Sequence, residues 1–345
     1  MNHFFSFEAT EENNTSIAIK NNINLSELDS VIGMNQASFL IIDTSFKLAL
    51  TERPEATDFI NSGYPVNGGE RCKSIDRVFE LINEIHNLKK KPEQIIAMGG
   101  GSLIDLCGYL VLTSMPDCRF TVIPTTPLSQ LTGFYKRKFF LNYDRKKDRL
   151  FVRGLPDYNL ILPDLLRVFQ MDDLREAHLV AFSVAIGYDS RFFYLVKRSL
   201  DSMVKDKVNW DYLTEMIWES NFLRAKATQN LKGKFPGETF ADFLQTATYL
   251  NLDYIKALSL GLRIEVFISR KLGYLCRETY EEIDHYLKKL ITMKRYDFDF
   301  QTLVSTVKEE GMVYLPILKS FGATENTRLK PGHVEDLLKE FISEK

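Results

Sequence analysis

Residues 94–114 read QIIAMGGGSLIDLCGYLVLTS and carry the strongest structural signal in the chain. An apolar run ends in Gly99, Gly100 and Gly101 and passes directly into a run with helical spacing. The first amides of a helix are unpaired and carry partial positive charge, and glycine lets a phosphate group approach them closely. The pattern predicts a strand, a turn and a helix whose start is a candidate phosphate cradle. The same glycines also suit an ordinary tight turn.

Segments with strand and helix patterns alternate on both sides of this stretch. Residues 75–88 have the apolar spacing of an amphipathic helix. Three more short apolar runs end in polar or breaking residues: SFLIIDTS (38–45), RFTVIPTT (119–126) and YNLILPD (158–164). Alternation of this kind is typical of a parallel sheet covered by helices.

The pattern changes near residue 164. From Asp164 onward the clusters of β-branched residues disappear, and amphipathic helical stretches follow one another, separated by breakers such as KGKFPGE. A chain of 345 residues is long enough for two hydrophobic cores. We therefore predict an α/β domain over residues 1–163 and an all-α domain over residues 164–345.

The composition excludes several classes of protein. Lys and Arg number 44 and Asp and Glu 46, so a formal net charge of −2 provides no basic surface for nucleic acid. The four cysteines lack C-x-x-C spacing, which argues against a zinc knuckle or a disulfide framework and fits a reducing compartment. We see no signal-peptide pattern and no apolar run near the roughly 20 residues needed to cross a bilayer. We expect a cytoplasmic protein that binds neither nucleic acid nor membranes.

The polar residues around the glycines resemble those of the 3-dehydroquinate synthase family, the sugar phosphate cyclases. That family has a G-E-x-x-K turn before a helix, then a strand ending in G-G-G, then an Asp and a Gly on the following helix, and a P-T-T turn after the next strand. In this chain the matching residues are Gly69, Glu70, Lys73, Gly99, Gly100, Gly101, Asp105, Gly108, Pro124, Thr125 and Thr126. The resemblance is strong up to about Thr126 and faint through the helical half. It implies a dehydroquinate synthase-like fold, with a Rossmann-like α/β domain and an all-α domain.

The resemblance also implies that the N-terminal domain binds NAD, with NADP left open. Asp43 would hold the adenosine ribose hydroxyls, and Glu70 and Lys73 would contact the nucleoside. The remaining implied cofactor residues are Gly99, Gly100, Gly101 and Ser102 at the pyrophosphate, and Asp105, Thr125 and Thr126 along the rest. Each also has an ordinary structural interpretation: Asp43 as a helix N-cap, Lys73 as a solvated side chain, and the two threonines as turn residues.

The catalytic half of the family uses a zinc ion held by one Glu and two His, from the motifs A-E-x-x-K, G-H-x-x-G-H and L-H-G. An alignment anchored on Arg175-Glu176 and Gly261 places other residues there: Ser183 at the Glu, Glu238 and Asp242 at the histidines of G-H-x-x-G-H, and Tyr254 at the later His. The resemblance therefore implies a cofactor half without the zinc ligands.

Two nearby residues support the same interpretation. The lysine of the A-E-x-x-K helix is replaced by Ile186. His178 is near Ser183 in sequence, but the spacing of five residues turns it to a different helix face, so we expect a structural histidine.

Positions that hold the substrate in the family are partly kept. Pro116-Asp117 replaces an R-G pair and removes one anion-binding group, whereas Lys138 keeps the position of a family lysine. Asn142 is retained, and Lys147-Asp148 stands where the family has Lys-Asn. Lys232 or Lys234 is a candidate substitute for a family arginine. We expect Lys138, Asn142 and Lys147 to hold an anionic group of a small-molecule substrate.

The replaced histidine positions offer two alternatives. Glu238, Asp242 and Tyr254 are candidates for proton transfer, because a carboxyl or phenol group in a dry site can be tuned toward neutrality. Glu238 and Asp242 also share a helix face, and with Asp253 or Asp189 they form a candidate oxygen-rich site for Mg²⁺, Mn²⁺ or Fe²⁺. The ordinary interpretation is that Glu238 stabilises the first turn of a helix.

Three functions remain open. The first is a divergent NAD-binding enzyme that acts without zinc on a polyhydroxylated or sugar-phosphate-like substrate. The second is an inactive cyclase homologue that serves as a nucleotide-binding or partner-binding subunit. The third is a cyclase with a replacement carboxylate metal site. The retained cofactor positions favour the first, and the family's usual homodimer is implied for all three.

Overall fold

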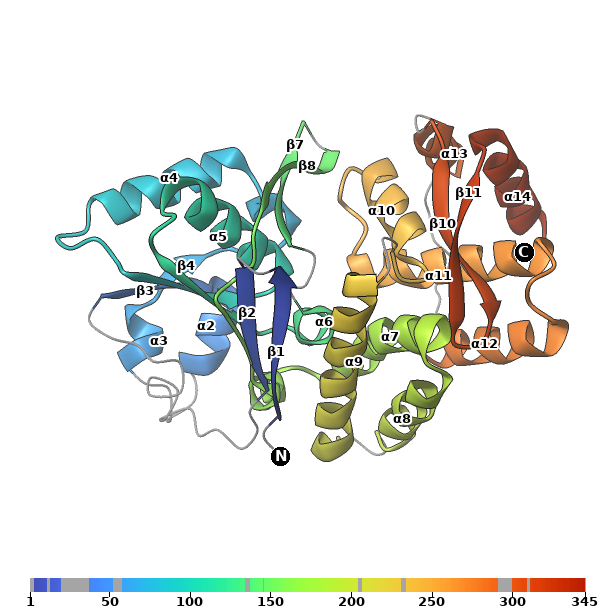
Figure 1. The fold of residues 1–345 in the computed structure, drawn as a ribbon, viewed down its shortest axis with the longest axis horizontal. Coiled ribbons are helices and arrows are strands. Elements are labelled where there is room, and N and C mark those ends of the chain that lie inside the picture. Colours follow the sequence, from blue (N-terminus) through green and yellow to red (C-terminus); the bar gives the residue numbers. More distant parts are fainter. Residues whose placement is uncertain are drawn as a thin grey trace. The chain divides into compact units, whose positions relative to one another are not determined.

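The computed structural model describes the chain except residues 1–2, 11–12, 20–36, 52–57, 134–136, 145, 204–206, 231–233, 291–299, 309–310 and 345. Contacts divide the chain into two compact units, Met1–Gln170 and Met171–Lys345 (Figure 1). The boundary predicted after residue 163 lies at the start of the short turn η3 (Pro163–Val168), just before this division. None of the described helices combines the length and the apolar character needed to cross a membrane.

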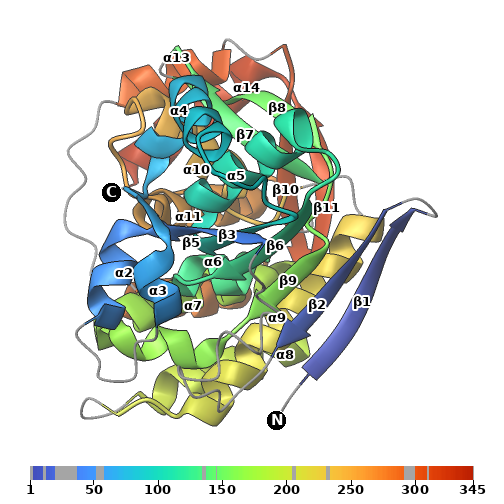
Figure 2. The same cartoon turned by 90° about the vertical axis from the view of Figure 1, so that its left-hand side faces the viewer.

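The first unit is built on a seven-stranded sheet (Figure 2). Its strands lie in the order β1 (His3–Thr10), β2 (Asn13–Ile19), β9 (Tyr158–Ile161), β6 (Arg119–Pro124), β5 (Gln94–Gly99), β3 (Ser38–Asp43) and β4 (Tyr64–Val66). The pairs are parallel except for the antiparallel hairpin β1–β2. The four apolar runs predicted as strands are confirmed as β3, β5, β6 and β9.

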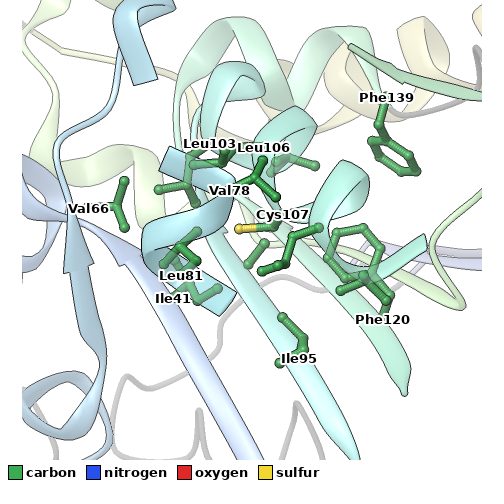
Figure 3. Packing of buried hydrophobic residues seen from close by; sticks show 14 of the residues in the cluster. Ile41, Val66, Val78, Leu81, Ile95, Leu103, Leu106, Cys107, Phe120 and Phe139 are labelled. Atoms are coloured by element: carbon green, nitrogen blue, oxygen red, sulfur yellow. The ribbon is translucent and has the colours of Figure 1, made fainter. Parts of the chain in front are cut away.

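Helices cover both faces of this sheet. On one face α4 (Ile75–His86) and α5 (Gly101–Ser114) pack Leu81, Leu103 and Cys107 against the strands (Figure 3). On the other face α2 (Thr44–Thr51) and α3 (Asp58–Ser62) contribute Phe46, Leu50 and Ile60. The chain therefore leaves β3 toward one face and leaves β5 toward the other. This change of face between neighbouring strands is the topological switch point of the sheet.

A second hairpin, β7 (Lys138–Tyr143) with β8 (Lys146–Arg153), packs on α5 and was not predicted from the sequence. The ring of Phe139 lies against Gly108 of α5, where a Cβ would come within 2.3 Å of the ring. Phe139 also meets Phe120 of β6 edge to face, with the ring centroids 5.6 Å apart. Gly108 is therefore needed so that the hairpin can approach the helix.

The second unit is helical, as predicted, and also contains a hairpin that the all-α prediction missed. Its elements are α7 (Met171–Tyr188), α8 (Ser190–Asp201), α9 (Trp210–Asn230), α10 (Glu238–Ala247), α11 (Tyr254–Lys271), α12 (Arg277–Leu290), α13 (Phe300–Lys308), β10 (Val313–Ser320), β11 (Ala323–Leu329) and α14 (Pro331–Ser343). The hairpin is antiparallel, and β11 is the only described strand that pairs with β10. Pro316 in β10 has no amide hydrogen to donate, and a strand that pairs on one side only tolerates a proline.

We expect Gly108→Ala to lower the free energy of unfolding by about 1–3 kcal/mol, because the added methyl group overlaps the Phe139 ring. The higher helix propensity of alanine offsets this only in part. Urea-induced unfolding measures the change. Gly332→Ala on α14 is the control: no described atom lies within 4 Å of its added Cβ, so it should be neutral or slightly stabilising. Equal stability of the two variants would contradict the packing of the hairpin on α5.

Candidate functional site

The glycine turn joins β5 to α5 without a side-chain cap. β5 ends at Gly99, and Gly100 is the N-cap of α5 with no side-chain hydrogen bond. A Cβ on Gly99 would lie 2.8 Å from Leu103, so packing explains that glycine. Gly101 differs, because no described atom lies within 4 Å of the Cβ that it lacks. A side chain at Gly101, next to the first amides of α5, would therefore meet no described atom beyond its chain neighbours and its own helix backbone.

Thr125 and Thr126 follow β6, which is paired with β5 so that Pro124 lies opposite Gly99. The amide of Thr125 donates to the Gly99 carbonyl at 3.0 Å, and the side chain is fully buried. Its Oγ1 has no hydrogen-bond partner among the described atoms. A buried hydroxyl without a partner is energetically costly and points to a missing partner.

Thr126 has the ordinary role expected of a turn residue. Its Oγ1 accepts from the Ser129 amide at 3.1 Å, and the Ser129 hydroxyl lies 3.1 Å from the Thr126 amide. The two residues form a capping box at the start of α6 (Pro127–Thr132). The cap accounts for Thr126 without a ligand.

Asp43 lies at the end of β3, and its carboxylate is the N-cap that the ordinary interpretation predicts. Oδ1 accepts from the Phe46 amide at 3.0 Å at the start of α2. Oδ2 lies against Gly68, where a Cβ would come within 2.0 Å of it. Residues Ile42 and Met98 are paired between β3 and β5, so Asp43 ends its strand beside Gly99.

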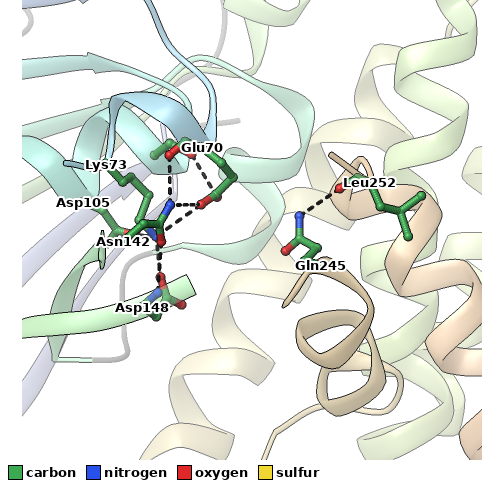
Figure 4. Close-up of polar contacts among 8 residues, drawn as sticks. Glu70, Lys73, Asp105, Asn142, Asp148, Gln245 and Leu252 are labelled. Carbon is green, nitrogen blue, oxygen red and sulfur yellow. Dashed lines mark hydrogen bonds and ion pairs between the residues drawn. The ribbon is translucent and has the colours of Figure 1, made fainter. Parts of the chain in front are cut away.

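Lys73 follows the short helix η2 (Glu70–Cys72) and is surrounded by carboxylates (Figure 4). Its Nζ lies 2.6 Å from Asp148, 2.8 Å from Asp105 and 3.8 Å from Glu70. The side chain is only 3% exposed, so the interpretation as a solvated lysine is wrong. Burial alone would lower the pKa of Lys73, but the carboxylates of Asp105 and Asp148 raise it above its usual range. Lys73 is therefore a charged, buried ammonium group.

Glu70 connects this cluster to the glycine turn. Ser102 Oγ donates to Glu70 Oε1 at 3.1 Å, and Asn142 Nδ2 donates to Oε2 at 3.1 Å. Burial raises the pKa of Glu70, but the charges of Lys73 and Lys147 outweigh it, and the net pKa is below the usual value. Glu70 is therefore ionised and held from both sides.

Asn142 has a positioning role in hairpin β7–β8. Its Oδ1 accepts from the Asp148 amide at 3.0 Å, and this bond holds Asp148 with a φ of 55° in the left-handed region. The side-chain nitrogen of Asn142, Nδ2, donates to Glu70, so Asn142 connects Glu70 and Asp148, which are both partners of Lys73. The structure thus brings four implied cofactor residues and two implied substrate residues into one cluster: Glu70, Lys73, Ser102, Asp105, Asn142 and Lys147.

Lys138 begins β7 and lies on the same hairpin. Its Nζ is 4.5 Å from the centroid of the Phe151 ring, in a cation–π contact. The side chain is partly exposed. The described hydrogen bonds and ion pairs do not place Lys138 in the Lys73 cluster.

The proton-transfer candidates of the second unit are engaged in other contacts. Glu238 accepts from Arg224 Nη1 and Nη2 at 3.1 and 3.2 Å, and both side chains are buried. Asp242 forms an ion pair with Lys234 at 2.6 Å. Tyr254 is the first residue of α11 and is partly exposed. Lys232 lies outside the described residues.

The carboxylate metal site considered as an alternative does not form. Asp189 is the N-cap of α8, and Asp253 is the N-cap of α11. No group of three His, Cys, Asp or Glu side chains in the described part of the chain is arranged to hold a metal ion. Each of the four carboxylates is used by a helix start or an ion pair, and no three of them form a group that could hold a metal ion.

The zinc donor set of the family also does not fit these residues. Zinc in proteins takes thiolate, imidazole and carboxylate ligands. The Ser183 hydroxyl donates to the Pro236 carbonyl at 2.6 Å, and Glu238 is bound by a guanidinium.

Arg224 and Glu265 were not recognised in the sequence. Glu265 is fully buried and accepts from the Gly237 amide at 2.5 Å and the Phe240 amide at 3.3 Å. Burial raises the pKa of Glu265 to about 8. A charged residue inside an apolar helical run was the available signal, in NFLRA (221–225) and LRIEVF (262–267).

His178 is the structural histidine that was predicted, with both ring nitrogens bonded. Nδ1 lies 2.8 Å from the Leu174 carbonyl and must donate to it, so Nε2 accepts from the Ser199 hydroxyl at 2.9 Å. The ring is fully buried, and burial lowers its pKa to about 4.

We expect His178 to make the protein less stable in acid. The unfolded chain binds a proton near pH 6.5 and the folded chain only near pH 4, so stability is lost as the pH falls through this window. The loss should approach about 3 kcal/mol. Unfolding at several pH values should give a flatter profile for His178→Gln than for the wild type, whereas His333→Gln, at an exposed histidine, should leave the profile unchanged. An unchanged profile in His178→Gln would refute the neutral, buried ring.

Known proteins resemble this chain in sequence and in fold. The family model described as 3-dehydroquinate synthase N-terminal matches residues 63–176. The 3-dehydroquinate synthase of Endomicrobium trichonymphae is 24% identical over 290 residues, covering 80% of this chain and 79% of that protein. The enzyme of the same name from Natranaerobius thermophilus is 26% identical over 282 residues, covering 75% of each chain.

Two solved structures share the fold over nearly the full length. A 2-epi-5-epi-valiolone synthase from Streptomyces hygroscopicus, with NAD⁺ and Zn²⁺ bound, aligns with a TM-score of 0.81 at 16% identity, covering 98% of this chain and 99% of that one. A 2-deoxy-scyllo-inosose synthase, complexed with carbaglucose-6-phosphate, NAD⁺ and Co²⁺, aligns with a TM-score of 0.79 at 14% identity and the same coverage. The chain is thus similar to 3-dehydroquinate synthases in sequence, and it shares the fold of these two solved structures over nearly its full length.

Proposed function

We propose that the chain is a divergent NAD-binding enzyme that acts without zinc on a polyhydroxylated or sugar-phosphate-like substrate. The observation that carries this proposal is the uncapped glycine turn at the topological switch point. β3 and β5 are neighbours, and their connections run to opposite faces of the sheet. Ligands of such sheets bind at the carboxyl ends of the strands at this point.

Two residues at the turn support a ligand because packing does not account for them. A Cβ at Gly101 would meet no described atom beyond its chain neighbours and its own helix backbone, so packing in the described part of the chain does not require a glycine there. Thr125 buries a hydroxyl that has no partner among the described atoms. A pyrophosphate at the start of α5 would meet unpaired amides and the positive end of the helix.

We assign the residues around the turn to the parts of a dinucleotide as the family resemblance implies. Asp43 would hold the adenosine ribose, and its negative charge favours NAD over NADP by repelling a 2′-phosphate. The other proposed cofactor residues are Glu70, Lys73, Gly99, Gly100, Gly101, Ser102, Asp105, Thr125 and Thr126. Bound there, NAD would take a hydride from the substrate carbon that bears a hydroxyl group, while the hydroxyl proton goes to a base, and would later return the hydride.

The charges around Lys73 indicate which lysines position their neighbours and which bind the substrate. Lys73 is neutralised by three carboxylates, so we assign it the positioning of Glu70, Asp105 and Asp148. Lys138 and Lys147 are partly exposed, and they supply the positive charge offered to an anionic group of the substrate. Asn142 fixes the hairpin that carries them.

Two of the three candidates for proton transfer are held in ion pairs. Glu238 and Asp242 are each ion-paired, so neither is poised as a free base in this structure. Tyr254, which is partly exposed at the start of α11, is the remaining candidate.

These ion pairs favour a second candidate function, an inactive homologue that binds a nucleotide or a protein partner. On that proposal the glycine turn still holds a nucleotide, but the second unit contributes no reacting group. The two candidates share the NAD site and differ in turnover, and the homodimer implied by the resemblance suits both.

Gly101→Ala tests the NAD site with little risk to folding, because the added methyl group meets no described atom. The methyl group would stand where the pyrophosphate approaches the amides, so we expect NADH affinity to fall about tenfold or more. Titration of NADH, followed by its fluorescence, measures the affinity. The control is Gly332→Ala, which adds the same group on α14 in equally open space. Unchanged NADH binding by Gly101→Ala, or no binding by the wild type, would defeat the proposal.

Lys138→Ala separates the two candidate functions. With NAD and a panel of free polyols and sugar phosphates, turnover is followed by NADH absorbance and by phosphate release, in the presence of a chelator. For an enzyme, we expect Lys138→Ala to lower kcat/KM on the order of a hundredfold. Lys146→Ala, at an exposed lysine of the same hairpin, should have little effect. NADH binding without turnover on any member of the panel would favour the inactive homologue.

A further inference from the structure

The start of α10 is the polar centre of the second unit. The turn from Phe235 to Glu238 leads into this helix, and it includes the position where the resembling family carries the first histidine of G-H-x-x-G-H. Ser183, at the position of the family's zinc-binding Glu, reaches the same turn through its bond to Pro236. Ser183 therefore reaches the turn that carries the former histidine position, although Ser183 stands in place of the family's Glu and Glu238 in place of its His.

We propose that the guanidinium group of Arg224 takes the place of a metal ion at this centre, as an internal cation that holds Glu238 and the turn. The inference extends the zinc-free part of the proposed function. It stands on contacts within the second unit, so it does not depend on whether the first unit binds NAD.

The contacts of Glu238 are those of a carboxylate held by a fixed cation. Both terminal nitrogens of Arg224 donate to Oε1, at 3.1 and 3.2 Å, and the Phe235 amide donates to Oε2 at 3.2 Å. The side chains of Arg224 and Glu238 are 3% and 5% exposed. The guanidinium carbon also lies 4.2 Å from the centroid of the Phe235 ring. Both carboxylate oxygens are thus directed at donors of the chain itself.

The rest of the turn is held by the protein as well. Ser183 donates to the Pro236 carbonyl, and Glu265 accepts from the Gly237 and Phe240 amides. Gly261 of α11 lets the two helices meet, because a Cβ there would lie 2.3 Å from the Gly237 carbonyl oxygen. The Pro236 carbonyl and the Gly237 and Phe240 amides, which surround the former ligand position, are therefore hydrogen-bonded to the protein itself.

Among the described residues of this centre, Arg224, Glu238 and Glu265 balance in charge without a metal. Arg224 carries one positive charge and Glu238 one negative charge. Glu265 is the second carboxyl group, and its raised pKa keeps it largely neutral below about pH 8. A divalent cation would add two charges to an enclosed, already neutral centre, at a large desolvation penalty. Arg224 is therefore a positioning residue that makes the unit independent of metal.

The first test is the metal content of the full-length protein, purified without chelators. We expect much less than one equivalent of zinc, no visible absorption bands on titration with Co²⁺, and no shift of the thermal midpoint with Zn²⁺ or a chelator. One equivalent of zinc that disappears in Glu238→Gln would overturn the inference. NADH binding is measured on the same preparations. If the wild type does not bind NADH, the proposed NAD site is wrong, but the inference about Arg224 is unaffected.

The second test removes the internal cation. Arg224→Gln leaves the Glu238 charge buried without its partner, and we expect the thermal midpoint to fall on the order of 10 °C. Lys234→Gln is the control, because it breaks the more exposed pair with Asp242 close to the same turn. The double variant Arg224→Met/Glu238→Leu should recover much of the loss, since it removes both charges together. Should Arg224→Gln fail to fold, Arg224→Lys keeps the charge but loses the paired hydrogen bonds, and an intermediate loss is expected.

The pH dependence distinguishes an internal cation from a side chain that only fills space. Without Arg224 the folded protein favours a neutral Glu238, so its pKa rises and the deficit of Arg224→Gln should be large at pH 8 and smaller at pH 5. Among the described groups, Tyr188 on α7 and Glu265 on α11 interact electrostatically with Glu238, and Lys234 before α10 interacts with Glu265. They are present in both proteins, so their titration largely cancels in the difference. A deficit that is independent of pH would overturn the inference.

Discussion

A buried ammonium group needs counter-charges, because it has lost its hydration. Lys73 imposes this requirement on the first unit, and segments far apart in the sequence meet it: η2 through Glu70, α5 through Asp105 and β8 through Asp148. The pairing holds hairpin β7–β8 beside the start of α5, and Asn142 completes the connection to Glu70. The buried charge of Lys73 thus helps to fix the position of the hairpin relative to the glycine turn, and with it the place of Lys147, together with the packing of Phe139 on Gly108.

The second unit also contains a buried cation, the guanidinium group of Arg224, that needs a counter-charge. Arg224 lies against Glu238 and the Phe235 ring, and the neighbouring amides and carbonyls are used by Ser183 and Glu265. The Lys73 cluster, by contrast, borders a helix start whose Gly101 faces open space. One centre is closed by its own bonds, and the other adjoins amides available to a ligand. That difference agrees with our proposals that the first unit binds a cofactor and that Arg224 takes the place of a metal ion in the second.

The strands around the glycine turn were predictable because each is a buried apolar run bounded by Gly, Pro or Asp. The hairpins were not. The strands of β7–β8, KFFLNY and KKDRLFVR, are partly exposed and carry charges that hide their alternation. In the second unit Pro316 interrupts the apolar strand β10, and β11 reads ATENTRL, which is polar along most of its length. An exposed two-stranded hairpin needs little apolar sequence, so patterns of apolar residues detect it poorly.

The motif residues divide according to whether the fold itself accounts for them. Thr126 caps a helix, Asp43 caps another with one oxygen, and Gly108 makes room for a phenyl ring. Spacing in the sequence cannot separate such residues from ligand-binding ones, because a cap and a ligand contact use the same residue type at the same place. It also cannot show partners such as Asp148 and Arg224, which lie 75 and 14 residues from the groups they hold. Among the described residues, no packing contact explains Gly101 and no hydrogen bond satisfies the Thr125 hydroxyl, so the ligand that we propose at the turn depends on these two residues more than on the number of motif positions retained.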